Sequence, residues 1–234
     1  MKTHNLNIQN QIQIDNITQR TISIIGGKGS GKTTTLKLIL DTSPVPVIVF
    51  DPIGTLVHPP ALRIKVYPRH VEQASQAAEK ITQILKNLRD LPNKDRKKRR
   101  VIISFQNMLQ AEINAFMDRF LPKLTIRDAL IAFDEAHEFI PQSGFRSTET
   151  ERYIRFCRNY NIGVILTSQR PATVAKNVLA LTDYLILYRL TWSHDIRAIR
   201  ELIATMKPER EVNAILRKLQ TQIYLQGMCI DFLK

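Results

Sequence analysis

The chain has 234 residues, and Lys and Arg outnumber Asp and Glu by 34 to 21, which gives a formal net charge of +13. With 44% hydrophobic and 24% charged residues, the composition is that of a folded domain and excludes wholesale disorder. Two cysteines exclude a disulfide framework and a four-thiolate zinc site, which favours a reducing, cytoplasmic compartment. Apolar runs of five or six residues exclude a membrane span. The charge favours a polyanionic partner, nucleic acid first, with simple solubility as the alternative.

The chain begins with alternating apolar and polar residues over 6–14, which predicts a strand or hairpin with one wet face within an N-terminal β element at 1–20. Short β-branched runs then alternate with helical stretches. The predicted strands are 21–25, 45–50, 101–105, 129–133, 163–168 and 184–190, and the predicted helices are 32–40, 71–91, 109–124, 148–160, 171–181 and 194–206.

Apolar strands that alternate with helices predict an α/β fold, with a mostly parallel sheet covered on both faces. The core of this fold spans 21–190. The remaining residues, 191–234, are predicted to form C-terminal helices, one of them at 208–219, and a terminal strand in LQTQIYLQG. We see no internal repeat or Gly/Ser linker, so we expect one domain over 1–234.

A glycine-rich segment, GGKGSGKT at 26–33, follows the first core strand and precedes a helix, as a Walker A phosphate loop requires. Its backbone N–H groups and the helix N-terminus suit phosphate oxygens. We expect Lys32 to reach the β- and γ-phosphates and Thr33 to bind Mg²⁺. No guanine-reading Asn-Lys-x-Asp motif occurs, which favours ATP. The expected nucleotide-binding residues are Gly26, Gly27, Lys28, Gly29, Ser30, Gly31, Lys32, Thr33 and Thr34.

An acidic pair, Asp134 and Glu135, ends the apolar run ALIAF. An Asp at this position is expected to hold Mg²⁺ through water, and Glu135 to orient or deprotonate the attacking water. His137 completes the string DEAH, and a packing role for it is as compatible with the sequence as a functional one. Glu138 is expected to be a helix or loop charge and not a catalytic residue.

Polar residues end another apolar strand at TSQ, and Gln169 is placed to hydrogen-bond both a γ-phosphate and water. Arg152, Arg155 and Arg158 lie three residues apart on one side of a predicted helix. We take Arg158 as the candidate for a catalytic arginine acting in trans, ahead of Arg170. A solvated basic stripe is the alternative.

A dense basic segment, NKDRKKRR at 93–100, holds six positive charges against one negative charge. Such a loop is suited to DNA phosphates without reading sequence, and a solvated surface loop is the alternative. The candidate DNA contacts are Lys94, Arg96, Lys97, Lys98, Arg99 and Arg100.

The order GGKGSGKT, VFDPIGTL, ALIAFDEAHEFIP and RNYNIGVILTSQRP resembles the ATPase core of the HerA/FtsK superfamily of DNA-pumping motors. The resemblance covers about residues 20–190 and the terminal LQTQIYLQG. It implies a RecA-like P-loop NTPase that uses ATP and Mg²⁺, with Gln169 as the polar sensor and Arg158 as the trans arginine. It also implies a homo-oligomeric ring, expected to be a hexamer, with double-stranded DNA through its pore.

We expect the chain to depart from several members of that superfamily, without their N-terminal barrel, winged-helix domain or membrane anchor. This minimal core is most similar to viral genome-packaging ATPases or to motors of mobile elements. A capsid or membrane portal protein is then an expected partner, and the host cytoplasm the expected location. The alternative is an ATPase for protein secretion or virion assembly, which would not need the basic segment. A DEAH-box helicase is disfavoured, because it needs two RecA-like halves.

Overall fold

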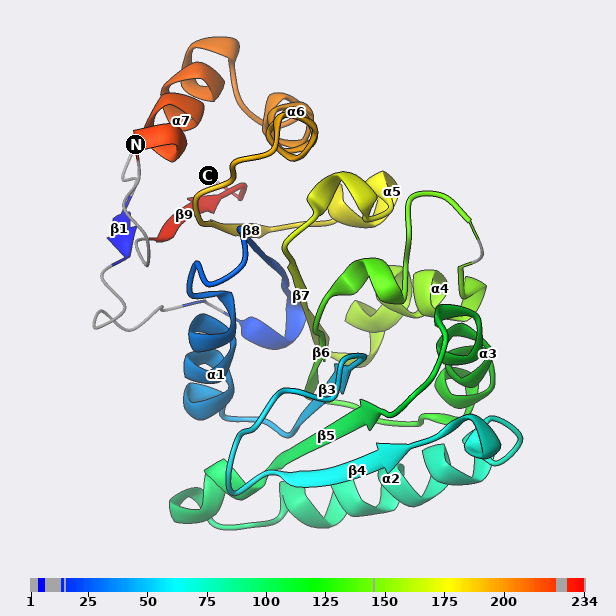
Figure 1. Ribbon diagram of the computed structural model, residues 1–234. Helices are drawn as coiled ribbons and strands as arrows, with labels where there is room; N and C mark the ends of the chain where they lie inside the picture. Colours follow the sequence, from blue (N-terminus) through cyan, green and yellow to red (C-terminus); the bar gives the residue numbers. More distant parts are fainter. Residues whose placement is uncertain (1–3, 7–13, 15, 145, 222–226, 234) are drawn as a thin grey trace.

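The computed structural model describes residues 4–6, 14, 16–144, 146–221 and 227–233 (Figure 1). Within these residues nine strands form one sheet, in the order β1-β9-β8-β2-β7-β6-β3-β5-β4. The strands are β1 (His4–Leu6), β2 (Thr21–Ile25), β3 (Val47–Asp51), β4 (Leu62–Val66), β5 (Arg100–Phe105), β6 (Ala129–Phe133), β7 (Ile162–Ser168), β8 (Tyr184–Leu187) and β9 (Gly227–Asp231).

Seven neighbouring strands, from β8 to β4 in the sheet order, pair in parallel. The antiparallel strand β9 pairs with β8 and with β1. All seven parallel strands therefore end at one edge of the sheet, called here the carboxyl edge, and begin at the opposite amino edge. Ligands of open α/β sheets bind at the carboxyl edge.

Helices cover both faces of the sheet (Figure 1). They are α1 (Lys32–Thr42), α2 (Ala74–Arg89), α3 (Gln110–Phe120), α4 (Thr148–Phe156), α5 (Lys176–Leu179), α6 (Ser193–Ala204) and α7 (Glu209–Thr221). The core is divided by the pleat of the strands, since alternate side chains point to opposite faces. In β3, Val47 and Val49 pack on the α1 side, whereas Ile48 and Phe50 pack with residues of α2 and α3 on the other.

The predicted fold, a mostly parallel sheet between helices, is confirmed. The strands predicted at 21–25 and 129–133 coincide with β2 and β6. The edge strand β4 was not predicted, because LRIKV carries two basic residues among its apolar ones. The strand predicted over 6–14 lies almost wholly outside the described residues. None of the helices in the described part of the chain combines the length and apolarity that a membrane crossing requires.

Two segments differ from their predicted structure. The helix predicted over 171–181 is a 3₁₀ turn at Pro171–Thr173 followed by the short α5. The terminal strand predicted in LQTQIYLQG is wrong at its start, because α7 continues to Thr221. Residues 222–226 of that segment lie outside the described residues, and its last residue, Gly227, is the first of β9. Val212, Ile215 and Leu219, all buried, form the apolar stripe of this amphipathic helix.

Candidate functional site

The glycine-rich loop lies at the carboxyl edge, between the end of β2 and the start of α1 (Figure 1). Gly31 has φ 110° and directly precedes the helix, a conformation that L side chains rarely adopt. Gly26 is packed so closely that an added Cβ would lie 2.4 Å from the Cβ of Tyr188. Its N–H donates to the carbonyl of Ser168 at 3.1 Å, and that of Gly27 to the carbonyl of Arg189 at 3.0 Å. The loop is therefore fixed to the ends of the two strands that flank β2.

Lys32 is the first residue of α1, and its side chain folds back over the loop. Its Nζ donates to the carbonyl oxygen of Gly27 at 2.9 Å. Burial lowers the pKa of Lys32, while the nearby Glu135 and Asp134 raise it. Thr33 and Thr34 are exposed beside it in the first turn of the helix. The Lys32 ammonium, the Thr33 and Thr34 hydroxyls and the N-terminus of α1 thus lie close together, an arrangement that suits the binding of a polyphosphate.

The acidic pair follows β6 and is linked to β7 through Thr167. The hydroxyl of Thr167 donates to Oδ1 of Asp134 at 2.5 Å and accepts from the backbone N–H of Glu135 at 3.1 Å. Burial raises the pKa of Asp134, the Thr167 hydrogen bond lowers it, and the charges of Glu135 and Asp51 raise it. Because the hydroxyl contacts both acidic residues, it fixes the turn that presents them.

Glu135 has φ 49° and ψ 64°, a left-handed conformation that is uncommon for a residue with a side chain. Such positions concentrate at functional sites. Its Oε2 accepts from the backbone N–H of Gln169 at 3.2 Å. The structure therefore brings together Lys32, Asp134, Glu135 and Gln169, which the sequence predicted as one site.

His137 lies between two carboxylates of the same turn. Its Nδ1 is 3.6 Å from Oε2 of Glu135, and its Nε2 is 3.3 Å from Oε1 of Glu138. The hydrogen bond from His137 lowers the pKa of Glu138. His137 therefore lies beside the candidate base, and the choice between its packing and functional roles stays a prediction.

A hard divalent cation fits the oxygen donors of this site. Among the described residues, no group of three or more His, Cys, Asp or Glu side chains forms a metal site on its own. Thr33 and Asp134 stand beside Lys32, where nucleotide phosphates would supply the other oxygens. Mg²⁺ is commonly bound in this way, by one or two protein groups together with substrate phosphates.

Two residues of the site went unassigned from the sequence. Thr167 was noticed only as part of a polar strand end, and the contact that reveals its role joins two separate strands. The Tyr188 hydroxyl hydrogen-bonds that of Thr35, which anchors α1 to the end of β8. A tyrosine in an apolar run gives no signal of this contact.

Asp51, the acidic residue of the segment VFDPIGTL, lies at the end of β3. Its carboxylate accepts from the backbone N–H groups of Gly54 and Leu56, each at 2.8 Å. The carboxylate is fully buried and lies 3.7 Å from the guanidinium of Arg63. These hydrogen bonds hold the loop that follows β3 in place beside the acidic pair.

The predicted DNA contacts at Arg99 and Arg100 are wrong. Arg100 is 0% exposed, and its guanidinium donates to the carbonyls of Leu40 at 2.6 Å and Ser43 at 3.1 Å. Arg99 is also buried and donates to the carbonyl of Pro44 at 2.9 Å. Both side chains therefore satisfy backbone oxygens where α1 ends, instead of facing solvent.

The rest of the basic segment forms a 3₁₀ helix, Asn93–Lys98, and not the predicted open loop. Lys97 and Lys98 have side chains 58% and 59% exposed, at 3.9 Å from Asp41 and 2.8 Å from Asp95. The side chains of Lys94 and Arg96 lie outside the described residues. Contact with DNA through Lys97 and Lys98 stays a prediction.

Arg158 lies at the amino edge, just before β7, and is not part of the site in its own chain. It forms an ion pair with Asp183, whose carboxylate also accepts from the backbone N–H of Thr21 at 2.7 Å. The Arg158 side chain is 44% exposed. It therefore remains accessible to a neighbouring subunit, and its action in trans stays a prediction.

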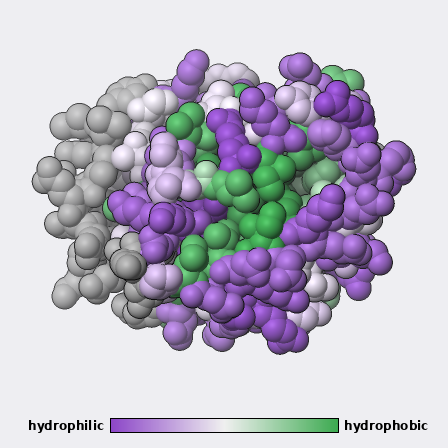
Figure 2. Space-filling model, turned by 90° about the horizontal axis from the view of Figure 1, so that it is seen from below, coloured by the Kyte–Doolittle hydropathy of each residue, from purple (hydrophilic) through white to green (hydrophobic). Residues whose placement is uncertain are grey.

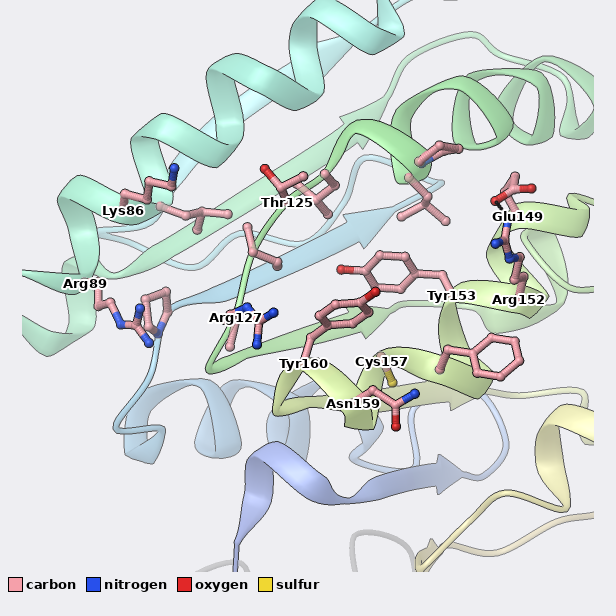
Figure 3. A pocket seen from close by; sticks show the side chains of 18 residues that line it. Lys86, Arg89, Thr125, Arg127, Glu149, Arg152, Tyr153, Cys157, Asn159 and Tyr160 are labelled. Carbon is pink, nitrogen blue, oxygen red and sulfur yellow. Dashed lines mark ion pairs between the residues drawn. The ribbon is translucent and has the colours of Figure 1, made fainter.

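A cavity of about 860 Å³ opens at the amino edge, between α2, α4 and the segments that lead into β6 and β7 (Figure 3). Apolar side chains line it, including Leu85, Leu124 and Phe156, and cationic ones surround it, including Lys86 and Arg152. From below, the space-filling view shows an apolar band crossing a hydrophilic surface (Figure 2). No predicted nucleotide-binding residue lines this cavity, so it is separate from the phosphate loop.

Solved structures with the same fold include viral and bacterial proteins. The genome packaging NTPase B204 from Sulfolobus turreted icosahedral virus 2, in complex with AMPPCP, is 14% identical with a TM-score of 0.61, covering 92% of this chain and 94% of that one. VirB4 of Thermoanaerobacter pseudethanolicus is 15% identical with a TM-score of 0.54, covering 91% and 86%.

The bacterial conjugative coupling protein TrwB is 9% identical with a TM-score of 0.53, and the match covers 82% of this chain and 73% of that one. At such identities the likeness establishes the fold, which is that expected from the HerA/FtsK resemblance. No curated protein matches the chain. The family model described as "AAA domain" matches residues 15–173, more than half of the chain, and includes the phosphate loop and the acidic pair. The chain therefore belongs to the AAA domain family and is a P-loop ATPase.

Proposed function

We propose that this protein is an ATP-driven motor that translocates double-stranded DNA, in genome packaging or transfer for a virus or mobile element. The observation that carries the proposal is the connected site at the carboxyl edge. There Lys32, Asp134 and Glu135 meet the end of β7, where the backbone of Gln169 binds the candidate base. A change at the γ-phosphate would act directly on a strand of the sheet, as a motor requires.

In this proposal each group has one task in hydrolysis. Lys32 neutralises the β- and γ-phosphates, and Glu135 takes a proton from the attacking water. Gln169 hydrogen-bonds the γ-phosphate and the water. Thr33 and Asp134 would hold Mg²⁺, which would offset the negative charge of the phosphates.

The proposed working form is a homo-oligomeric ring, expected to be a hexamer, in the cytoplasm of the cell or viral host. Arg158 supports this arrangement, since its exposed guanidinium lies at the edge opposite its own ATP site. Across a subunit interface, the Arg158 guanidinium would reach the ATP site of the neighbouring subunit. A capsid or membrane portal protein is the partner that we propose for docking the ring.

The test is the ATPase rate of the full chain with and without double-stranded DNA at low salt, together with DNA affinity over a salt series. We expect stimulation by DNA and an affinity that falls with salt. A Lys97→Gln, Lys98→Gln double variant should reduce the salt slope by up to about 2, near 1 for each lost phosphate contact. The matched control, Lys80→Gln with Lys123→Gln, removes two exposed lysines elsewhere and should leave the slope unchanged.

If DNA neither binds nor stimulates at low salt, the DNA motor is excluded while the ATPase stands. The secretion or assembly ATPase would then replace it. If both double variants lower the slope equally, the basic segment has no special role in DNA binding.

A further inference from the structure

Two exposed side chains that hydrolysis does not use are stacked at the carboxyl edge. Arg170 follows β7, Trp192 follows β8, and the Arg170 guanidinium carbon lies 4.0 Å from the centre of the Trp192 ring. In the sheet, β2 lies between those two strands. The stacked pair therefore bridges the strands on either side of the one that leads into the phosphate loop.

The bridge is held in place from beneath. Asp195, in the first turn of α6, is 2% exposed, and its Oδ2 lies 3.4 Å from Nε of Arg170. Its Oδ1 accepts from the backbone N–H of Ala172 at 3.2 Å. The hydrogen bond between Gly27 and the Arg189 carbonyl fixes the segment before Trp192 against the loop itself.

Despite this support, both side chains of the pair are partly open to solvent. Trp192 is 54% exposed, and the side chain of Arg170 is 44% exposed. A tryptophan that served packing would be covered further, and an arginine that served only Asp195 would not need an aromatic ring beneath it. Oriented planar groups left open beside a ligand site form a stacking surface for another planar group.

We propose that Trp192 and Arg170 form the platform on which the purine base of ATP stacks. This inference rests on the ATP site proposed above. In that site the loop and Lys32 would hold the phosphates, with the γ-phosphate toward Glu135 and Gln169, so the nucleoside would extend from the loop in another direction. The bridge is the planar, exposed surface attached to that loop, and aromatic and guanidinium planes both stack on bases.

Trp192 is the single tryptophan of the chain, so its emission reports on this position alone. The full-length protein is titrated with Mg²⁺ and AMPPCP, a non-hydrolysable ATP analogue, and separately with inorganic tripolyphosphate, which has the phosphates and no base. Calorimetry measures occupancy in both titrations. We expect a saturable change in emission with AMPPCP and none with tripolyphosphate at equal occupancy.

Variants then measure the contribution of the platform. Trp192→Ala should weaken AMPPCP binding about tenfold, the loss of one stacked base, and leave tripolyphosphate binding unchanged. Trp192→Phe, which keeps an aromatic plane, should stay within about threefold of the wild type. Arg170→Lys keeps the charge without the plane and should weaken AMPPCP binding alone.

The proposal is overturned if AMPPCP binds without changing Trp192 emission, or if Trp192→Ala weakens both ligands equally. It is also overturned if a single-stranded oligonucleotide changes the emission while AMPPCP does not, which would make the pair a nucleic-acid contact. Each of these results leaves the ATPase in place. If neither AMPPCP nor tripolyphosphate binds the wild type, the ATP site itself is wrong.

Discussion

The two edges of the parallel sheet use charged residues in opposite ways. At the carboxyl edge, Lys32, Asp134 and Glu135 lie close together, and their hydrogen bonds to the loop and to β7 leave them facing one ligand site. At the amino edge, Arg100 donates hydrogen bonds to backbone carbonyls of its own chain, and Arg158 forms an ion pair with Asp183. The charge of a side chain alone therefore does not locate the site, whereas the groups that each charge contacts do.

The cavity and the candidate site lie at opposite edges of the sheet. The 860 Å³ cavity lies at the amino edge and is lined largely by apolar and aromatic side chains. The carboxyl edge has the buried cation, the carboxylate with a raised pKa and the left-handed Glu135. Perturbed ionisable groups that converge on one point are the better guide to chemistry here.

The largest expected effect is on ATP turnover and would link the amino edge of one subunit to the ATP site of another. If Arg158 completes a neighbour's ATP site, Arg158→Ala should lower ATP turnover by about 10³-fold while ATP binding persists. Its free energy of unfolding should change by less than about 1 kcal/mol, because the pair with Asp183 is partly exposed. Arg155→Ala is the control, since Arg155 pairs with Glu151 on the same helix and should keep its turnover.

A subunit-mixing experiment isolates action in trans. Arg158→Ala subunits have an intact Glu135, and Glu135→Gln subunits have an intact Arg158, so each is expected to be inactive alone. Mixed rings contain interfaces in which both intact residues meet, and ATPase activity should return on mixing. If Arg158→Ala alone turns over normally, Arg158 serves only its pair with Asp183. If both variants are inactive alone and mixing restores no activity, action of Arg158 in trans is excluded.

The next effect is on stability and concerns the amino edge alone. Arg100→Met should lower the free energy of unfolding by about 3 kcal/mol, since it leaves buried carbonyls without donors. Lys98→Met, two residues earlier and exposed, should cost less than about 0.5 kcal/mol. Urea denaturation measures both. Equal small losses would mean that Arg100 is not needed for the fold, and the correction of its DNA role would lose its physical reason.

The sequence allowed the local parts of the site to be predicted and not the distant ones. The phosphate loop and the acidic pair are contiguous motifs, and strand ends at one edge follow from the parallel sheet. The contact of Thr167 with Asp134 joins two strands whose register no local pattern specifies. The basic run at 93–100 gives no sign of which of its side chains are buried. Arg99 and Arg100 are buried because the chain enters the sheet there, at the start of β5.

The smallest expected effect is a change in the pH dependence of kcat/KM, which a variant at the carboxyl edge should show and a variant at the amino edge should not. Asp134 must be ionised to hold Mg²⁺; burial raises its pKa, and the hydrogen bond from Thr167 lowers it. Thr167→Val removes that bond, so the pKa of Asp134 should rise further. The acidic limb of the kcat/KM profile should therefore move to higher pH, because more of the carboxylate is protonated at a given acidic pH. Thr182→Val is the control, since the buried Thr182 hydroxyl pairs with that of Ser23 at 2.7 Å at the amino edge. It should cost stability without moving the limb, and equal shifts in both variants would mean that the limb does not report on Asp134.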